Sequence, residues 1–167
     1  MKKRQDIDIA EVRKRLDYDQ ETGKFYWKVR SSRNVKAGSL AGCITPVGYR
    51  CIRLDGAGYM AHRLAWAYVH GVWPEYEIDH IDGVKDNNAI ANLRDVPSKI
   101  NMQNRKVATK GSNSGVLGVH WNKHAKKWRA VIVLNRKPIF LGYFDNIDDG
   151  SNAYIEAKRR IHIGCTI

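Results

Sequence analysis

A polar, basic segment that contains Gly and Ser, KVATKGSNSG at residues 106–115, interrupts the 167-residue chain past its midpoint. Composition of this kind is typical of a linker and not of a packed core. We therefore expect two small domains, one over residues 1–105 and one over residues 116–167, joined by residues 106–115. Hydrophobic residues make up 43% of the chain, including five Trp and eight Tyr, which is enough for each domain to bury a core.

Positive charge is concentrated toward the two ends of the chain. The net charge of +12 divides into +6 over residues 1–60 (13 Lys and Arg against 7 Asp and Glu), −1 over residues 61–105 (5 against 6) and +7 over residues 106–167 (11 against 4). Two basic flanks around a slightly acidic centre favour a polyanionic partner, most commonly nucleic acid. A cationic surface that serves only solubility is the alternative interpretation.

The cysteine and hydropathy patterns exclude several classes of protein. No apolar run approaches the roughly 18 residues of a membrane span, so no membrane partner is expected. The basic start of the chain lacks the apolar stretch of a secretory signal. Cys43, Cys51 and Cys165 are far apart along the sequence, odd in number and form no C-x-x-C pair, which argues against a zinc ribbon or a disulfide framework. A reducing cytoplasm is the expected location.

Apolar spacing predicts an α+β fold for the first domain, with a β-rich N-terminal part. Residues 7–17 have the spacing of a short helix, and residues 24–30 are rich in the aromatic and branched residues of strands. Residues 48–62 predict a hairpin that turns at DGAG. Residues 62–70 predict a helix that ends at Gly71.

The middle of the chain predicts a strand, a loop and a returning strand. Residues 76–82 contain Ile78 and Ile81 and favour a strand, and NLRDV after the loop can return beside it. Ser98 is the expected N-cap of a short helix that follows.

The second domain is expected to be a three-stranded meander packed on one helix. GVLGVHWN, KWRAVIVLN and KPIFLGYF predict the strands, and NRK predicts a tight turn between the last two. The helix follows, with Asp148 and Asp149 in its first turn, where negative charge suits the helix dipole. Alternation along KWRAVIVL places Ala130 on the face toward the helix and Arg129 and Val131 on the exposed face.

The most acidic stretch of this basic chain, EIDHIDGVKDNN at residues 77–88, contains the candidate chemistry. Neighbouring side chains on a strand point to opposite faces, so Asp79 and His80 are expected to serve two roles around one phosphate and not one shared ligand set. Asp79 suits a hard cation such as Mg²⁺, to which Asn101 can add an amide oxygen. His80 suits proton transfer near neutral pH. The alternative interpretation is that Asp79 and His80 are polar surface residues of a hairpin and have no catalytic role.

The segment HRLAWAYVHGVWPEYEIDHIDGVKDNNAIANLRDVPSKINMQN resembles the HNH endonuclease family, in particular its phage and homing members. The HRL-aromatic helix, IDHIDG, NLR and an Asn-rich helix follow in the family's order. The resemblance implies that Asp79 is a metal ligand, that His80 is the general base, and that Asn92 bridges the finger and keeps His80 oriented. It places Asn101, where the family usually has His, as the second metal ligand, with Asn104 one turn later as the alternative.

The same resemblance implies a ββα-metal finger, with its core motif at residues 62–105, that hydrolyses phosphodiester bonds of double-stranded DNA. One divalent cation per site is expected, Mg²⁺ with Mn²⁺ as a substitute, because an Asn ligand disfavours Zn²⁺. His80 would take a proton from water, and the products would carry 5′-phosphate and 3′-hydroxyl ends. One site cuts one strand, so a monomer is expected to nick, whereas double-strand breaks need a homodimer or two events. If the enzyme is phage-encoded, it would act in the cytoplasm of a bacterial host.

The sequence allows two alternative roles for each of two residues in the HRL helix. His62 either faces the site or caps its helix, and a structural role is preferred. Arg63 either contacts phosphate or lies on a solvated helix face.

The sequence from SGVLGVHWN to AKRRIHIG resembles the AP2 DNA-binding domain through its G-V, W-R-A, LG-Y-F and A-Y-x-x-A landmarks, in that order. The resemblance implies that the three-stranded sheet docks in a DNA major groove. The expected DNA contacts are basic side chains around the exposed sheet face: His120, Lys123, Lys127, Arg129, Arg136 and Lys137. Val131 and Val133 stand where polar base contacts are expected, which favours phosphate contacts over base readout.

Two functions from different classes fit these patterns. One is a metal-dependent HNH endonuclease of the phage or homing type. The other is a catalytically silent, sequence-specific DNA-binding protein that retains the nuclease fold. The presence of both Asp79 and His80 favours the enzyme.

Overall fold

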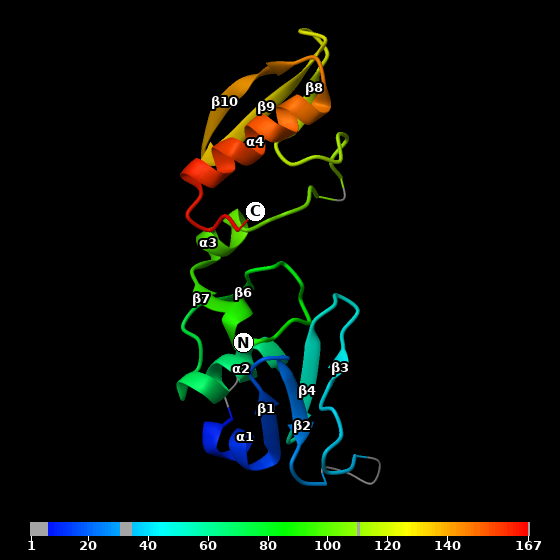
Figure 1. Cartoon of the computed structure of the whole chain (residues 1–167), viewed down its shortest axis with the longest axis vertical. Helices are drawn as coiled ribbons and strands as arrows, with labels where there is room; N and C mark the ends of the chain where they lie inside the picture. The colour runs from blue at the N-terminus through cyan, green and yellow to red at the C-terminus, as the bar shows by residue number, and fades with distance from the viewer. Residues whose placement is uncertain (1–6, 31–34, 110, 167) are drawn as a thin grey trace. The chain divides into compact units, whose positions relative to one another are not determined.

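The computed structural model describes residues 7–30, 35–109 and 111–166, and the chain divides into two compact units, Met1–Pro97 and Ser98–Ile167. Figure 1 shows the helices and strands of both units. The division precedes the end of the first predicted domain at residue 105, so helix α3 (Ser98–Gln103) belongs to the second unit. There the Gly164 amide donates to Gln103 Oε1 at 3.0 Å. The predicted bounds of the nuclease domain stay a prediction.

The first unit begins with helix α1 (Ile9–Arg15) and a hairpin of β1 (Leu16–Asp19) and β2 (Lys24–Trp27). Asp8 starts the helix by accepting a hydrogen bond from the Ala10 amide, as an N-cap residue does. The helix and the strand β2 confirm the sequence prediction. The strand β1 was not predicted, because Leu16 continues the apolar spacing of the helix while its backbone is already extended.

A three-stranded antiparallel sheet follows, in the order β3 (Cys43–Ile44), β4 (Arg50–Leu54) and β5 (Ala57–Met60). The strands β4 and β5 are the hairpin predicted over residues 48–62. Cys43 lies opposite Cys51 across β3 and β4, so these two residues are neighbours although they are apart in sequence. Both thiols are free in the structure.

Helix α2 (Ala61–His70) lies at the centre of the core of the first unit and contacts α1, β4 and β5. It ends at Gly71, whose left-handed φ of 73° allows the C-cap that the sequence predicted. The buried hydrophobic residues around it come from every element of the unit except β3, β5 and a short 3-10 turn at Ile90–Asn92: Val12, Leu16, Tyr18, Phe25, Trp27, Ala41, Ile52, Leu54, Ala61, Leu64, Ala65, Ile78 and Leu93. One core therefore joins the N-terminal part of the chain to the segment that resembles a nuclease.

The hairpin of β6 (Glu77–His80) and β7 (Leu93–Val96) confirms the predicted strand, loop and returning strand. A single turn of 3-10 helix, η1 (Ile90–Asn92), precedes β7 and contacts α2. Ser98 is the first residue of α3 and not its N-cap. The predicted cap position was therefore wrong by one residue.

The second unit contains an antiparallel sheet in the order β10–β9–β8, formed by β8 (Val119–Asn122), β9 (Lys127–Leu134) and β10 (Lys137–Phe144). Helix α4 (Ile147–Ile161) lies across one face of this sheet (Figure 1) and buries Ala130 beneath it. The three strands, the helix and the inward face are as predicted, whereas AP2-type packing stays a prediction. Within the ranges that the structure describes, no helix has the length and apolar character needed to cross a membrane.

Gly23, in the turn between β1 and β2, fits against the loop that precedes β7. Its φ is +69°, and an added Cβ atom would lie 2.2 Å from the backbone of Asn88 and Ala89. We predict that Gly23→Ala lowers the free energy of unfolding by roughly 2–3 kcal/mol, because neither backbone can move without breaking other contacts. Urea unfolding measures this value. Gly56→Ala is the matched control, since Gly56 has a φ of +74° with no atom near its Cβ position, and it should lose only about 1 kcal/mol. Equal losses in the two variants would contradict the proposed close contact.

Candidate active site

The β6–β7 hairpin buries both residues of the predicted catalytic pair. Asp79 is 7% exposed and His80 is 5% exposed, although the two are adjacent on a short strand. Their partners across the hairpin are Arg94 for Asp79 and Leu93 for His80. Burial of two ionisable side chains in a row is costly unless each is compensated by hydrogen bonds, so their partners define the site.

His80 lies in a cluster of polar and aromatic rings contributed by three separate parts of the first unit. Its Nε2 atom is 3.2 Å from Oδ1 of Asn88. Its ring centroid is 5.2 Å from that of His62 on α2 and 6.0 Å from that of Tyr49, which precedes β4. Tyr49 and His62 also contact each other, with centroids 5.2 Å apart. The imidazole of His80 is therefore held by ring contacts in addition to its hydrogen bond with Asn88.

Asn88 is the most deeply buried polar residue of this cluster, with 1% of its surface exposed. Its Nδ2 donates to the backbone carbonyl of Asp86 at 3.1 Å. Its own backbone carbonyl accepts a hydrogen bond from the Tyr18 hydroxyl at 2.6 Å, and burial raises the pKa of that hydroxyl well above its ordinary value. Asn88 was not among the predicted site residues, so its contact with His80 is a finding of the structure.

Asp79 forms an ion pair with Arg94 directly across the hairpin. Arg94 donates from Nε at 2.9 Å and from Nη2 at 2.7 Å, and both bonds reach the same carboxylate oxygen, Oδ2. The guanidinium compensates the buried carboxylate and fixes its orientation. Arg94 was not among the predicted site residues, although its position opposite Asp79 follows from the hairpin register.

Asn92 bridges the two ends of the loop between β6 and β7. Its Nδ2 donates to Asp82 Oδ1 at 2.9 Å and to the Asn87 carbonyl at 2.8 Å, and its Oδ1 accepts from the Asp82 amide at 3.0 Å. Burial opposes ionisation of Asp82, but hydrogen bonds from the Val84 amide, Asn87 and Asn92 outweigh it and lower the pKa of Asp82. Asp82 and Asn87 are therefore loop residues, and the role of Asn92 in orienting His80 stays a prediction.

His62 does not cap its helix. The N-cap of α2 is Met60, which makes no side-chain capping bond, and the His62 ring lies against His80. Burial, then the neighbouring charges of His80 and Arg63, lower the pKa of His62 to about 4. Its Nδ1 atom is buried and has no hydrogen-bond partner among the residues that the structure describes. His62 is thus a neutral ring at the site and not the preferred structural cap.

Arg63 turns toward the backbone that leads into β6. Its Nη1 donates to the Tyr76 carbonyl at 3.3 Å, and its guanidinium lies 6.0 Å from the ring centroid of Trp73. Its contact with phosphate stays a prediction.

The two amide candidates for the metal site lie in the second unit. Asn101 is on α3, and Asn104 follows that helix, is 5% exposed, and accepts a hydrogen bond from the Thr166 hydroxyl. Asp79 belongs to the first unit and Asn101 to the second, and the pairing of Asp79 with Asn101 stays a prediction. Within residues 7–30, 35–109 and 111–166, no group of three or more His, Cys, Asp or Glu side chains is placed to hold a metal ion. A carboxylate with an amide oxygen is instead a donor set suited to Mg²⁺, which retains several waters.

The predicted DNA contacts of the second unit lie around the uncovered face of the sheet. Five of the six are exposed: His120, Lys123, Arg129, Arg136 and Lys137. Lys127 is half-buried and forms an ion pair with Asp145 at 3.1 Å. Their contact with DNA stays a prediction.

Two exposed aromatic rings share this face with Arg129. Phe140 and Tyr143 of β10 have centroids 5.1 Å apart, and the Arg129 guanidinium lies 5.7 Å from the Phe140 centroid. Strict alternation would put residues 140 and 143 on opposite faces. A shift in register between Phe140 and Gly142 brings both to the same face, which explains why the sequence did not predict the pair.

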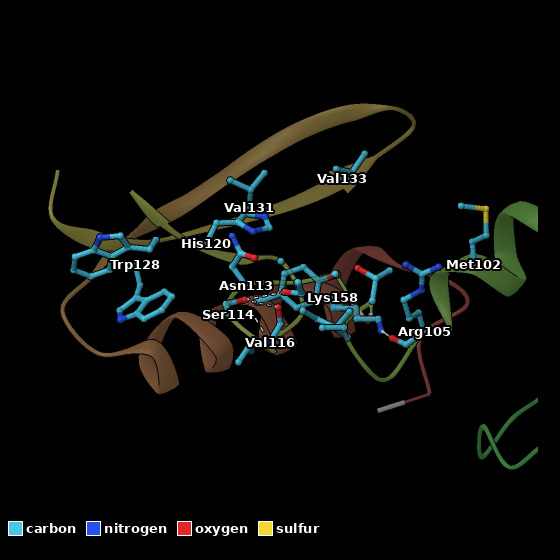
Figure 2. Close-up of a pocket in the computed structure, with 18 of the residues that line it drawn as sticks. Met102, Arg105, Asn113, Ser114, Val116, His120, Trp128, Val131, Val133 and Lys158 are labelled. Atoms are coloured by element: carbon cyan, nitrogen blue, oxygen red, sulfur yellow. Dashed lines mark hydrogen bonds between the residues drawn. The ribbon is translucent and has the colours of Figure 1, made fainter. Parts of the chain in front are cut away.

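A pocket of about 840 Å³ adjoins the same sheet, and Figure 2 shows His120, Val131 and Val133 on its strand side and Arg105 and Lys158 on the other side. None of its described lining residues is acidic. Lys158 is 2% exposed, donates from Nζ to the Arg105 carbonyl, and has its pKa lowered by burial. The described lining of the pocket is therefore basic. Within it, the buried Lys158 links α4 to the backbone of Arg105.

Comparison with known protein families identifies the middle segment of the chain. Residues 59–103 match the HNH endonuclease family. The match runs from β5 to α3 and includes Asp79, His80 and Asn92. It confirms the HNH resemblance of this segment, which is less than half of the chain.

Two phage proteins are similar to this chain over longer stretches than the HNH segment. Protein 3.8 of Escherichia phage T7 is 38% identical over 77 residues, which are 46% of this chain and 63% of that protein. DNA endonuclease I-HmuI of Bacillus phage SP01 is 32% identical over 132 residues, which are 76% of this chain and 66% of that protein. The chain thus spans less than two thirds of either relative. No solved structure matches it.

The lowered pKa of His62 predicts a pH-dependent stability. Between the ordinary histidine pKa of 6.5 and the native value of about 4, the unfolded chain binds a proton that the native HNH segment does not. Stability should therefore fall as the pH is lowered through this interval, by on the order of 3 kcal/mol in full. Urea unfolding at several pH values should show a weaker fall for His62→Phe than for the wild type. His124→Gln, which removes an exposed histidine, should keep the wild-type dependence. Parallel curves for wild type and His62→Phe would contradict the assignment.

Proposed function

We propose that this chain is a metal-dependent DNA endonuclease of the phage HNH type. One observation carries the proposal: an adjacent, buried Asp79 and His80 on one strand of a hairpin, inside the segment that matches the HNH endonuclease family. A structural hairpin gains nothing from burying two ionisable residues in a row, whereas hydrolysis of a phosphodiester needs both a cation site and a base.

Asp79 and Asn101 would hold one divalent cation, Mg²⁺ or Mn²⁺, which when bound stabilises negative charge on the phosphate and on the leaving oxygen. The ion pair with Arg94 fixes the orientation of the Asp79 carboxylate. Asn104 is the alternative amide, and its Oδ1 accepts a hydrogen bond from the Thr166 hydroxyl.

His80 is the general base of the proposed reaction. Its imidazole removes a proton from water, the water oxygen forms a bond to phosphorus, and the bond from phosphorus to the 3′ oxygen breaks. The 3′ oxygen takes up a proton from solvent, and the imidazolium of His80 returns its own proton to solvent. The ends are a 5′-phosphate and a 3′-hydroxyl. A monomer has one such site and would nick one strand of a duplex, whereas a homodimer could cut both.

The second unit would anchor the enzyme on double-stranded DNA. Its uncovered sheet face combines Arg129 and His120 with the aromatic pair Phe140 and Tyr143, and the pocket beside it has a cationic lining. Basic side chains contribute affinity through phosphates, and flat aromatic rings can pack on sugars or bases. A soluble enzyme of this kind would act in the cytoplasm of a bacterial host.

We predict that His80→Ala lowers the cleavage rate by about 10²–10⁴-fold and leaves the affinity for DNA within a few-fold, because a general base contributes little to ground-state binding. Cleavage of supercoiled plasmid and binding of a labelled duplex measure the two quantities. His124→Ala removes an exposed histidine from the turn between β8 and β9 and should cut at the wild-type rate. Wild-type cleavage by His80→Ala would reject the mechanism, and the absence of cleavage by the wild type would favour a silent DNA-binding protein.

The sheet face is tested separately through Arg129. We predict that Arg129→Ala weakens binding to duplex DNA and makes the slope of log affinity against log salt shallower by roughly 0.9, the value for one lost phosphate contact. Arg160→Ala is the matched control, because it removes the same charge from α4, where Arg160 pairs with Glu156 at 2.5 Å. Fluorescence anisotropy over a series of salt concentrations gives both slopes. An unchanged slope for Arg129→Ala would remove this face from the DNA interface.

A further inference from the structure

The orientation of the Asn88 amide is fixed by its surroundings. A backbone carbonyl only accepts hydrogen bonds, so the group of Asn88 that lies 3.1 Å from the Asp86 carbonyl must be the NH₂ group. The other end of the amide, Oδ1, then lies 3.2 Å from Nε2 of His80. Rotation of the amide by half a turn would place two acceptors against each other at Asp86.

This orientation determines which nitrogen of His80 carries the proton. Oδ1 of Asn88 is an acceptor only, so Nε2 of His80 must donate. A neutral imidazole has one N–H group, which leaves the lone pair on Nδ1. We propose that Asn88 is a positioning residue that holds His80 as the Nε2–H tautomer and so makes Nδ1 the nitrogen that accepts the proton from water. The catalytic meaning of this assignment rests on the proposed endonuclease function.

The N-terminal part of the chain holds Asn88 in place. The Tyr18 hydroxyl of β1 donates to the Asn88 carbonyl at 2.6 Å, and the Ile90 amide donates to the Gln20 carbonyl at 3.1 Å. Gly23, in the turn between β1 and β2, packs against the Asn88 backbone. These contacts stabilise the backbone of the loop around Asn88, whereas the bond to the Asp86 carbonyl orients its amide side chain toward His80.

Three variants of the full chain separate the acceptor from the fold. Asn88→Leu removes both the acceptor for His80 and the donor to Asp86. Asn88→Asp removes the same donor but keeps an oxygen that accepts from Nε2. Tyr18→Phe removes a hydrogen bond to the Asn88 backbone and leaves the amide side chain unchanged, so it controls for loss of stability alone.

The tautomer is measured directly by ¹⁵N NMR of histidine-labelled protein without DNA, at a pH above the ordinary histidine pKa, with the His80 signals assigned by their loss in His80→Ala. We expect a protonated Nε2 and an unprotonated Nδ1 in the wild type, in Asn88→Asp and in Tyr18→Phe. Asn88→Leu should shift His80 toward a mixture of the two tautomers. A proton on Nδ1 in the wild type, or an unchanged tautomer in Asn88→Leu, would overturn the proposal. If Asn88→Leu does not fold, the wild type and Asn88→Asp still decide it.

Cleavage kinetics give the second readout. Asn88→Leu should lower kcat by about 10–100-fold with KM for DNA nearly unchanged, and Asn88→Asp should recover most of this loss. Tyr18→Phe should cut at a rate near that of the wild type. Equal losses in Asn88→Leu and Asn88→Asp would show that the loop bond to Asp86 matters and not the acceptor, and would refute the proposal. A wild type that fails to cut DNA would refute the proposed function and leave the tautomer measurement to stand by itself.

Discussion

The loop between β6 and β7 is held by hydrogen bonds from two sides, and the position of His80 depends on it. Asn92 ties the start of the loop to its end, and the β1–β2 hairpin fixes the segment at Asn88. Asn88 then reaches His80, while Arg94 across the hairpin holds Asp79. A short hairpin alone is at best marginally stable in water, so two buried ionisable residues can be kept in one geometry here only because the surrounding core fixes both strands.

Much of the fold follows from local patterns in the sequence. The apolar spacing of residues 7–17 and 62–70 predicts α1 and α2, and Gly71 ends α2 where the left-handed C-cap requires glycine. Alternation along KWRAVIVL predicts both the strand β9 and the face that α4 covers. Asp79, His80 and Asn92 were singled out because their order in the sequence resembles a known family, and the family match includes them. These features depend on residues that are near one another along the chain.

The remaining features depend on contacts between residues that are far apart in sequence. Tyr18 and Asn88 meet across the core, and Tyr49, His62 and His80 come from three different elements. The periodicity of apolar residues within one segment cannot predict contacts between residues of different elements. The exposed pair of Phe140 and Tyr143 could not be predicted for a different reason. A register shift within β10 breaks the alternation on which the strand prediction relied. The end of the first unit at Pro97 reflects packing of α3 with the C-terminal residues, which composition does not reveal.

Incubation of the purified full chain with supercoiled plasmid, in Mg²⁺ and in excess EDTA, tests the central claim most directly. The account predicts conversion to nicked circles in Mg²⁺, with 5′-phosphate and 3′-hydroxyl ends that a DNA ligase can seal, and no conversion in EDTA. Nicking that persists in excess EDTA, or nicks that ligase cannot seal, would contradict a cation held at Asp79 and in-line attack by water at His80.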